Sequence, residues 1–306
     1  MMKCDNEYFH KEHAMKVSGF TFVRNANQLG FPFLQSIQSI LPLVDEFVIN
    51  VGESQDQTLS HIESLREPKI KILQSQWNTR MTQKGFVYGQ QKMMAQYHCT
   101  GDWAFYLEAD EIVHEQDHTK ILQAMQTYLH DDRVEALVFD YLHFYGNIST
   151  IVWSPAWYRR APRIIKTSVR SYAPDGLFWV VLDKKNKVGR YPRAALVPAT
   201  IYHYGWVRPE TCMQEKMSQV QSFWSAQNKQ IPNINYRAID PQTLRLFTGC
   251  HPAVLGDFFP TTPTLFSANA AHVLTKRERK NRAGLWVEKI LKIDLSKKHY
   301  RLVSTL

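Results

Sequence analysis

The stretch "GDWAFYLEADEIVHE" (residues 101–115) places aromatic residues directly before a group of acids. Trp103, Phe105 and Tyr106 are residue types enriched in strands. Ligands of open α/β sheets sit at the carboxyl ends of the strands. A strand with a buried interior and a functional carboxyl end therefore accounts for both halves of the stretch. We predict such a strand at 102–109, with Asp110 exposed at its end.

The segments around this strand alternate between strand-like and helix-like patterns. Further strands are indicated by β-branched and aromatic runs, and helices by apolar residues at helical spacing. The predicted strands are 17–23, 45–52, 69–74 and 134–142, and the predicted helices are 33–41, 57–65, 89–99 and 118–130. This alternation is typical of an α/β fold with a mostly parallel, Rossmann-like sheet flanked by helices.

The composition of the sequence changes after Tyr145. Residues 146–206 are rich in aromatic residues, Arg and Pro, with short strand-like runs at 162–169, 176–182 and 199–205. A helical pattern over 209–227 is followed by loop-rich sequence. We predict three parts: an N-terminal tail (1–16), a catalytic domain (17–206), and a helical, loop-rich C-terminal extension with a basic tail (207–306).

Composition limits the class of protein. Hydrophobic residues make up 44% of the 306 residues, enough for a sizeable core, and no apolar run approaches the roughly 18 residues of a membrane span. The cysteines stand alone, without the paired spacing of a zinc site; they are Cys4, Cys99, Cys212 and Cys250. With no apolar segment near the first residue, we expect a cytoplasmic protein with reduced thiols.

The net charge of +9 is concentrated near the C-terminus. Residues 276–301 hold ten Lys or Arg against three Asp or Glu, so the rest of the chain nets only +2. Trp286, Ile290 and Ile293 fall on one helical stripe among these charges. The segment is either a solvated helix packed on its own domain or a dock for an anionic membrane surface, on the inner face of the membrane. Nucleic acid is not expected, since no recognised motif accompanies the charge.

The acidic group suits a metal site. Glu108 and Asp110 lie two residues apart on an extended segment, so their side chains share one side. One carboxylate can hold Mn²⁺ or Mg²⁺ while the other accepts hydrogen bonds from a ligand, and a diphosphate would complete the metal's shell. The alternative is that Asp110 and Glu111 cap the helix that follows.

The order of elements over residues 17–206 resembles the family 2 glycosyltransferases, which have the GT-A fold. "LEADE" (107–111) is similar to their metal signature, with Glu108 in place of the first acid and Asp110 at the metal position. "FVRNA" (22–26) matches the end of their first strand, and "VGESQDQT" (51–58) matches the next loop without its leading acids. The resemblance implies nucleotide-sugar contacts from Val23, Asn25, Ser54, Asp56 and Glu108.

The resemblance is closer to bacterial members that build lipopolysaccharide core and other surface glycans. "PRIIK" (162–166) and "IYHYGW" (201–206) look like two of their later elements. A late histidine often supplies a further metal ligand in GT-A enzymes, which makes His203 the candidate here. The alternative is a packed histidine between two tyrosines.

The family resemblance implies transfer of a sugar from a nucleotide-diphosphate donor to a hydroxyl of a glycan or lipid-linked acceptor. An inverting enzyme needs a carboxylate that takes the acceptor proton. The Glu-Asp pair common in the family is absent, and we predict that Asp175 in "RSYAPDGLFW" (170–179) is this base. The alternative is an ordinary Asp-Gly turn.

Two further groups of residues carry open alternatives. Three arginines either contact phosphate or form the exposed face of a strand; they are Arg159, Arg160 and Arg163. Three tryptophans either stack on sugar rings or belong to the core; they are Trp153, Trp157 and Trp179. Two other functions also stay open, a nucleotidyltransferase and a non-catalytic glycan-binding or membrane-binding protein on the same fold.

Overall fold

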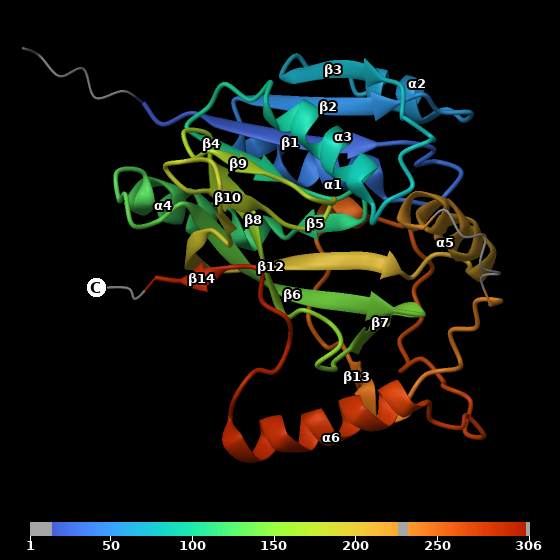
Figure 1. Cartoon of the computed structure of the whole chain (residues 1–306). Helices are drawn as coiled ribbons and strands as arrows, with labels where there is room; N and C mark the ends of the chain where they lie inside the picture. Colours follow the sequence, from blue (N-terminus) through green and yellow to red (C-terminus); the bar gives the residue numbers. More distant parts are fainter. Residues whose placement is uncertain (1–13, 226–231, 304–306) are drawn as a thin grey trace, which may run out of the picture.

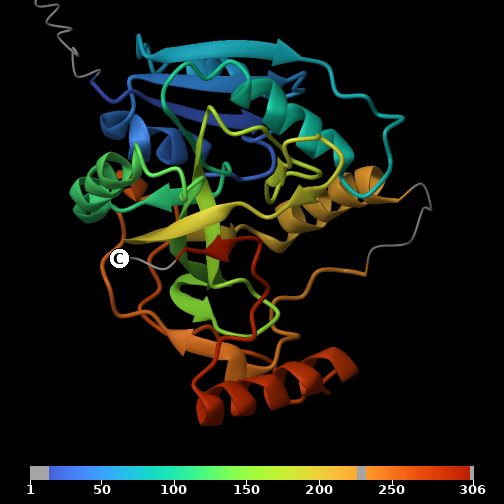
Figure 2. The ribbon, with the colours of Figure 1, turned by 60° about the vertical axis from the view of Figure 1, so that its left-hand side comes forward.

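The computed structural model describes residues 14–225 and 232–303, in which helices flank a large mixed sheet (Figures 1 and 2). Part of the basic tail, at 304–306, and Cys4 lie outside the described residues. The first four predicted strands form the parallel part of the sheet, in the order β4-β1-β2-β3. Their bounds are β1 Val17–Val23, β2 Glu46–Gly52, β3 Ile70–Ser75 and β4 Trp103–Tyr106.

Apolar residues alternate between the two faces of these strands. On β1, Val17 and Val23 join one buried cluster with α1 and α4, and Phe20 joins the other with α3. The alternation follows from the two-residue period of a strand that is covered on both faces. The helices between the strands are α1 Phe33–Ile40, α2 Thr58–Glu63, α3 Phe86–Gln96 and α4 His118–Tyr128, with a 3₁₀ turn at Leu41–Leu43 where Pro42 ends α1.

The prediction of a mostly parallel sheet is correct for these four strands, while the rest of the sheet is mixed, with parallel and antiparallel pairs. β6 (Ala136–Tyr145) turns at Gly146, whose φ of +72° suits glycine, into the antiparallel strand β7 (Asn147–Val152). β8 (Arg160–Lys166) then runs antiparallel between β4 and β6. The physical reason is that residues 146–160 contain no helix, and parallel pairing requires a long crossover connection.

The strand β12 (Arg193–Trp206) connects the later sequence to the acidic stretch. It pairs in parallel with β6 and antiparallel with β5 (Glu111–Val113). In this register His203 lies opposite both Glu111 and His143. A residue far along the sequence is thereby placed beside the acids that follow β4.

The C-terminal part contributes to the same sheet. β13 (Leu244–Leu246) extends it next to β7, and β14 (Arg301–Leu302) pairs with β12. α5 (Glu210–Trp224) and α6 (Lys276–Leu291) are its helices, and 3₁₀ turns lie at Glu115–Asp117, Pro241–Thr243 and Ala253–Leu255. A separate small sheet contains β9 Ser171–Tyr172, β10 Val180–Leu182 and β11 Gly189–Arg190. The domain boundary at residue 206 stays a prediction.

Within the described residues, no helix is long and apolar enough to cross a bilayer. The three described cysteines, Cys99, Cys212 and Cys250, form no disulfide.

Candidate active site

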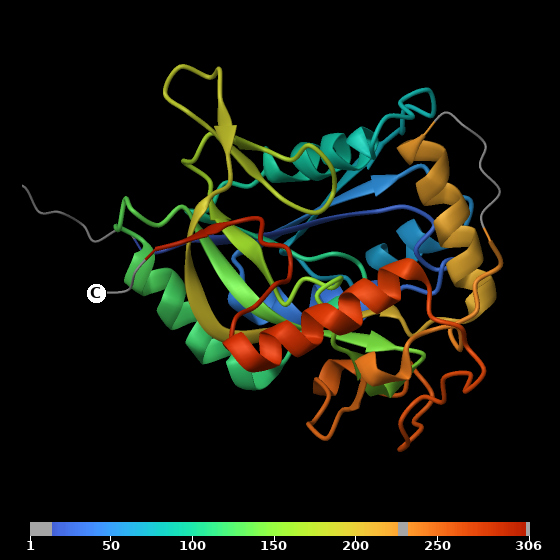
Figure 3. The same ribbon diagram turned by 60° about the horizontal axis from the view of Figure 1, so that its bottom comes forward.

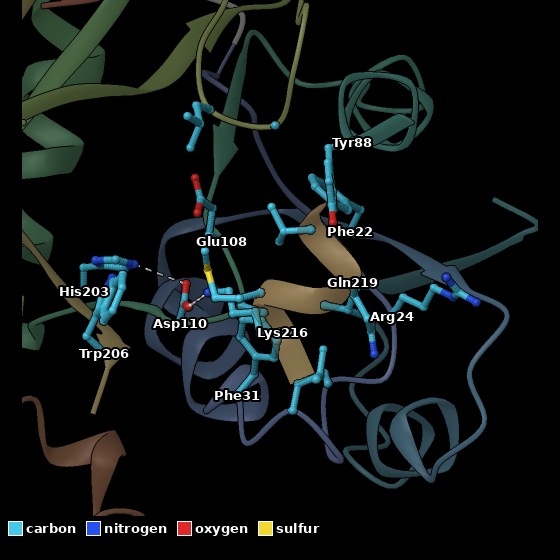
Figure 4. A pocket seen from close by; sticks show the side chains of 18 of the residues that line it. Phe22, Arg24, Phe31, Tyr88, Glu108, Asp110, His203, Trp206, Lys216 and Gln219 are labelled. Carbon is cyan, nitrogen blue, oxygen red and sulfur yellow. Dashed lines mark hydrogen bonds and ion pairs between the residues drawn. The ribbon is translucent and has the colours of Figure 1, made fainter. Parts of the chain in front are cut away.

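A cavity of about 640 Å³ opens where the parallel strands end (Figure 4). Val23 ends β1, Trp77 follows β3 and Glu108 follows β4, and all three line the cavity. Lys216 and Gln219 reach it from α5, which crosses the cavity in the close-up view. The cavity adjoins β1, whose neighbours are β2 and β4, at the point where the strand order of the parallel part reverses. This is where ligands of open α/β sheets bind.

The acids after β4 are placed differently from two of the sequence expectations. Glu111 begins the strand β5 rather than a helix, so the helix-capping alternative is wrong. Asp110 is 1% exposed and not at an exposed strand end, because His203, Arg208 and Lys216 pack against its carboxylate. Glu108 and Asp110 nevertheless both line the cavity.

The predicted metal residues, Asp110 and His203, lie together with Glu108, which was predicted to contact the nucleotide sugar. Glu108, Asp110 and His203 each offer one ligand atom, and these atoms lie within 4.8 Å of one another; among the described residues this is the one such group. Nε2 of His203 is 3.6 Å from Oδ1 of Asp110. Atoms that share a divalent ion at about 2.1 Å lie roughly 3 to 4 Å apart. Two carboxylates and an imidazole form a donor set that suits Mn²⁺.

A second histidine determines which nitrogen of His203 carries a proton. Nε2 of His143 lies 2.6 Å from the carbonyl oxygen of Tyr158, which can only accept, so this nitrogen donates. Burial, followed by the nearby His203, lowers the pKa of His143 well below its ordinary value, so the ring is neutral and its Nδ1 accepts. Nδ1 of His203, 2.8 Å away, must therefore be the donor. That leaves Nε2 of His203 facing Asp110, where it either donates to the carboxylate or, without a proton, points a lone pair at it.

When Nε2 carries no proton, this pair of atoms favours a cation between them. A lone pair and a carboxylate oxygen that face each other without a proton repel unless a positive charge lies between them. Metal-bound histidines commonly donate their other ring nitrogen to a neighbour, as His203 does to His143. Sequence patterns gave no signal for His143, because only the register of β6 with β12 brings it to His203.

Gly205 keeps the space beside these atoms open. A Cβ on Gly205 would lie 2.4 Å from Nε2 of His203 and 3.2 Å from Oδ2 of Asp110. Any larger residue would displace the imidazole or fill the space between the two ligand groups. The "HYG" order of residues 203–205 therefore fits the metal site as well as the strand.

Two cations already accompany Asp110. Its Oδ2 accepts from Nη2 of Arg208 at 2.7 Å and from Nζ of Lys216 at 3.0 Å. Burial raises the pKa of Asp110, but Lys216 and His203 oppose it and hold the pKa well below the ordinary value. Burial lowers the pKa of both cations. Neither Arg208 nor Lys216 was predicted from sequence, because they reach the site from the loop after β12 and from α5.

Arg163 organises the other two acids. This fully buried side chain forms two hydrogen bonds to Glu111, at 2.7 and 2.6 Å, and one to Glu108 at 2.9 Å. Arg163 thus does not lie on an exposed strand face, and its guanidinium is already paired and is not free to bind phosphate. Burial, followed by the charge of Glu111, raises the pKa of Glu108 to about 7. Glu111 also accepts from the hydroxyl of Tyr141 at 3.0 Å and lies outside the cavity lining, as a structural partner.

The other two arginines for which phosphate contact was one alternative are paired elsewhere. Arg159 lies 2.6 Å from Glu288, and Arg160 lies 2.6 Å from Asp140. Neither lines the cavity.

The candidate nucleotide-binding residues after β1 and β2 connect two loops by hydrogen bonds. Oδ1 of Asn25 accepts from the backbone of Gln55 at 2.8 Å, and Oγ of Ser54 accepts from the backbone of Asn25 at 3.0 Å. Asp56 accepts from the backbone amides of Gln28 and Thr58 at 2.8 and 3.0 Å. Of the residues predicted here, Val23 lines the cavity and Asn25, Ser54 and Asp56 do not. Their contact with a nucleotide stays a prediction.

Asp175 lies in the loop between β9 and β10. Its Oδ1 accepts from the backbone of Leu177 at 2.8 Å, and it is the neighbours Gly176 and Leu177 that line the cavity. The fully buried Lys92 of α3 donates to the carbonyl of Gly176 at 3.3 Å and fixes the loop against the site. Burial, then Arg163, lowers the pKa of Lys92 well below its ordinary value. Lys92 was not singled out in the sequence.

Of the three tryptophans considered for sugar stacking, Trp157 lines the cavity. Trp179 is fully buried and donates to Gln96, while Trp153 lies against Arg159 and Arg245. The core alternative is therefore correct for Trp179.

The end of the cavity away from the acids is aromatic. Phe22, Trp77, Tyr88 and Trp224 line it, with Arg24 over the Trp77 ring at 5.5 Å. The ring nitrogen of Trp77 is buried and has no hydrogen-bond partner among the described residues. The cavity thus joins an acidic end to an aromatic end, and the buried Trp77 nitrogen lies against Gly52.

Comparison with known proteins finds structural likeness only. No protein-family model matches the chain, and no curated protein matches its sequence. The chain is similar to GT-A glycosyltransferases. The S. aureus TarS fragment 1–349 matches at 15% identity and a TM-score of 0.39, over 67% of this chain and 64% of that one, just under two thirds of its length.

A second likeness is to glucosyl-3-phosphoglycerate synthase from Mycobacterium tuberculosis in complex with Mn²⁺, UDP-glucose and phosphoglyceric acid. It matches at 14% identity and a TM-score of 0.31, over 42% of this chain and 44% of that one. Both TM-scores lie below 0.5, and the function proposed below is argued from the site of this chain alone.

Proposed function

We propose that this protein is a metal-assisted glycosyltransferase that moves a sugar from a nucleoside diphosphate to a hydroxyl of a glycan or lipid-linked acceptor. The observation that carries the proposal is the group Glu108, Asp110 and His203, at the charged end of a cavity whose other end is aromatic. A nucleotide sugar has the same polarity, with an aromatic base at one end and a diphosphate near the reacting carbon.

The aromatic end suits the nucleobase. Phe22, Trp77 and Tyr88 offer ring faces and edges for stacking. Lys216 lies beside Asp110 and Arg24 lies over the Trp77 ring, and both line the cavity, where they can bind the phosphates (Figure 4). Asn25, Ser54 and Asp56 support this arrangement by holding the two loops in place.

Glu108, Asp110 and His203 would hold the divalent ion, which when bound would neutralise charge on the leaving diphosphate. The protein's part is to fix the ligand atoms: His143 orients His203, Gly205 leaves room, and Arg208 anchors Asp110. The same Asp110 carboxylate receives Lys216, so a cationic side chain stays beside the diphosphate position.

The base we propose is Asp175, in an inverting reaction. Its loop reaches the cavity through Gly176 and Leu177, and Lys92 holds the loop from behind. Asp175→Asn keeps the size of the side chain but removes the base, so kcat should fall by about 10²- to 10⁴-fold with little change in donor affinity. An unchanged kcat would exclude Asp175, and loss of thermal stability would indicate a structural turn.

The function as a whole is tested by incubating the protein with Mn²⁺ and a panel of UDP-, GDP- and ADP-linked sugars, and measuring release of the nucleoside diphosphate. We expect release from one class of donor, abolished in Glu108→Gln and retained in the matched surface variant Lys184→Met. Release of pyrophosphate from a nucleoside triphosphate would indicate a nucleotidyltransferase instead. Binding without turnover, in the presence of acceptor glycans, would indicate a non-catalytic protein.

A further inference from the structure

The helix α6 carries its apolar residues on the outside of the protein. It lies at the lower edge of the fold in Figure 1 and crosses the front in Figure 3. Trp286 is 66% exposed and Ile290 is 53% exposed, and three apolar residues around the helix end, Leu291, Ile293 and Leu295, are also exposed. A helix of a globular protein usually turns such a stripe toward the core. Here an exposed apolar stripe remains on the surface.

The inward face of α6 is instead held by ion pairs. Arg282 lies 2.6 Å from Asp240, and Glu288 lies 2.6 Å from Arg159. A capping box between Thr275 and Glu278 begins the helix. Glu288 on the inner side, Arg282 on the flank and the close approach of Gly284 to Pro155 together hold the helix with Trp286 and Ile290 facing outward.

The charges around the stripe are of one sign. All three acids of the segment are engaged by the protein itself, Glu278 by Thr275 and His272, Glu288 by Arg159, and Asp294 by Arg159 and Ser296. The exposed charged residues around the stripe are basic; they are Lys276, Arg277, Arg279, Lys280, Lys289, Lys292, Lys297 and Lys298. The outer surface thus combines apolar side chains with a cationic border.

We propose that this surface docks on an anionic lipid bilayer, with Trp286 and Ile290 entering the headgroup boundary and the surrounding lysines facing the lipid phosphates. A basic amphipathic helix with Trp and Ile on its apolar side has the chemistry of an interfacial helix, and each Lys or Arg near an anionic surface adds to binding. The same charges disfavour a second copy of this chain as the occupant, since two cationic borders would repel.

The test is cosedimentation of the full chain with vesicles of phosphatidylcholine alone and with added phosphatidylglycerol, at low and high salt. We expect binding only to the anionic vesicles, weakened by salt. Trp286→Ser combined with Ile290→Ser should lower the affinity more than tenfold, and Lys289→Gln should lower it about fivefold. All three positions are exposed, so the variants should keep the wild-type unfolding temperature.

The matched control removes charge from another exposed surface. Lys184, Lys185 and Lys187 lie in the loop between β10 and β11, and their replacement by Gln should change the affinity much less than Trp286→Ser with Ile290→Ser. Equal losses in the control and in the α6 variants would overturn the proposal, as would failure of the wild type to bind anionic vesicles at low salt. A dimer in sedimentation velocity that Trp286→Ser dissociates would assign the surface to self-association instead.

Discussion

The replacement Asp110→Asn should lower the stability of the protein strongly. The carboxylate is 1% exposed and accepts from Arg208 at 2.7 Å and Lys216 at 3.0 Å. The amide keeps the shape but leaves Arg208, which is 1% exposed, without its counter-ion. Removing one partner of a buried ion pair costs about 3 to 5 kcal/mol. For a chain of this size that corresponds to a loss of roughly 5 to 8 °C in unfolding temperature.

The assay is thermal unfolding followed by circular dichroism, without metal. Asp257→Asn is the matched control, because Asp257 is exposed, and it should change the free energy of unfolding by about 0.5 kcal/mol at most. The double variant Asp110→Asn with Lys216→Met should be less destabilised than the sum of the single variants, because both act on one interaction. If Asp110→Asn unfolds at the wild-type temperature, the proposed pairing with Arg208 and Lys216 is wrong.

Three further predictions concern the same site. Gly205→Ala should weaken binding of Mn²⁺ in isothermal calorimetry while costing about 1 to 3 kcal/mol of stability, and unchanged metal affinity would show that the space beside His203 is not needed. His143→Phe keeps a ring but loses the acceptor for His203, so Mn²⁺ affinity should fall about 10- to 100-fold, and no loss would contradict the assigned proton positions. The pKa of Glu108 is raised to about 7 in the folded protein, so between about pH 5 and pH 7 Glu108 keeps a proton that the unfolded chain has released. The free energy of unfolding should therefore decrease as pH rises through this range. Glu108→Gln should remove this part of the pH dependence in urea titrations, and an identical pH dependence in both proteins would refute the raised pKa.

The parallel half of the fold could be predicted because each of its elements has a complete local signal. The strand 17–23 has its aromatic and β-branched run, and α1 has apolar spacing that ends at Pro42. The antiparallel insertion of β8 could not be predicted, because strand order depends on pairing between segments far apart in the chain. β5 has three residues and no alternating pattern of its own.

The candidate site likewise contains residues that could be predicted from the sequence and residues that could not. Glu108 and Asp110 were found because they follow a strand directly, and His203 through its resemblance to a family element. Arg208 and Lys216 carry no local mark of their role, since only the positions of the loop after β12 and of α5 bring them to Asp110. His143 depends on strand register in the same way.

Calorimetry of Mn²⁺ and UDP, singly and together, on the wild type and Lys216→Met tests whether the cavity binds a divalent ion together with a diphosphate. The site holds three carboxyl groups, Glu108, Asp110 and Glu111, and three basic groups, Arg163, Arg208 and Lys216, so a divalent ion adds uncompensated charge unless a diphosphate arrives with it. We predict that each ligand binds more tightly in the presence of the other. Independent binding of the two, or Mn²⁺ binding that UDP does not alter, would contradict the proposed diphosphate-sugar site.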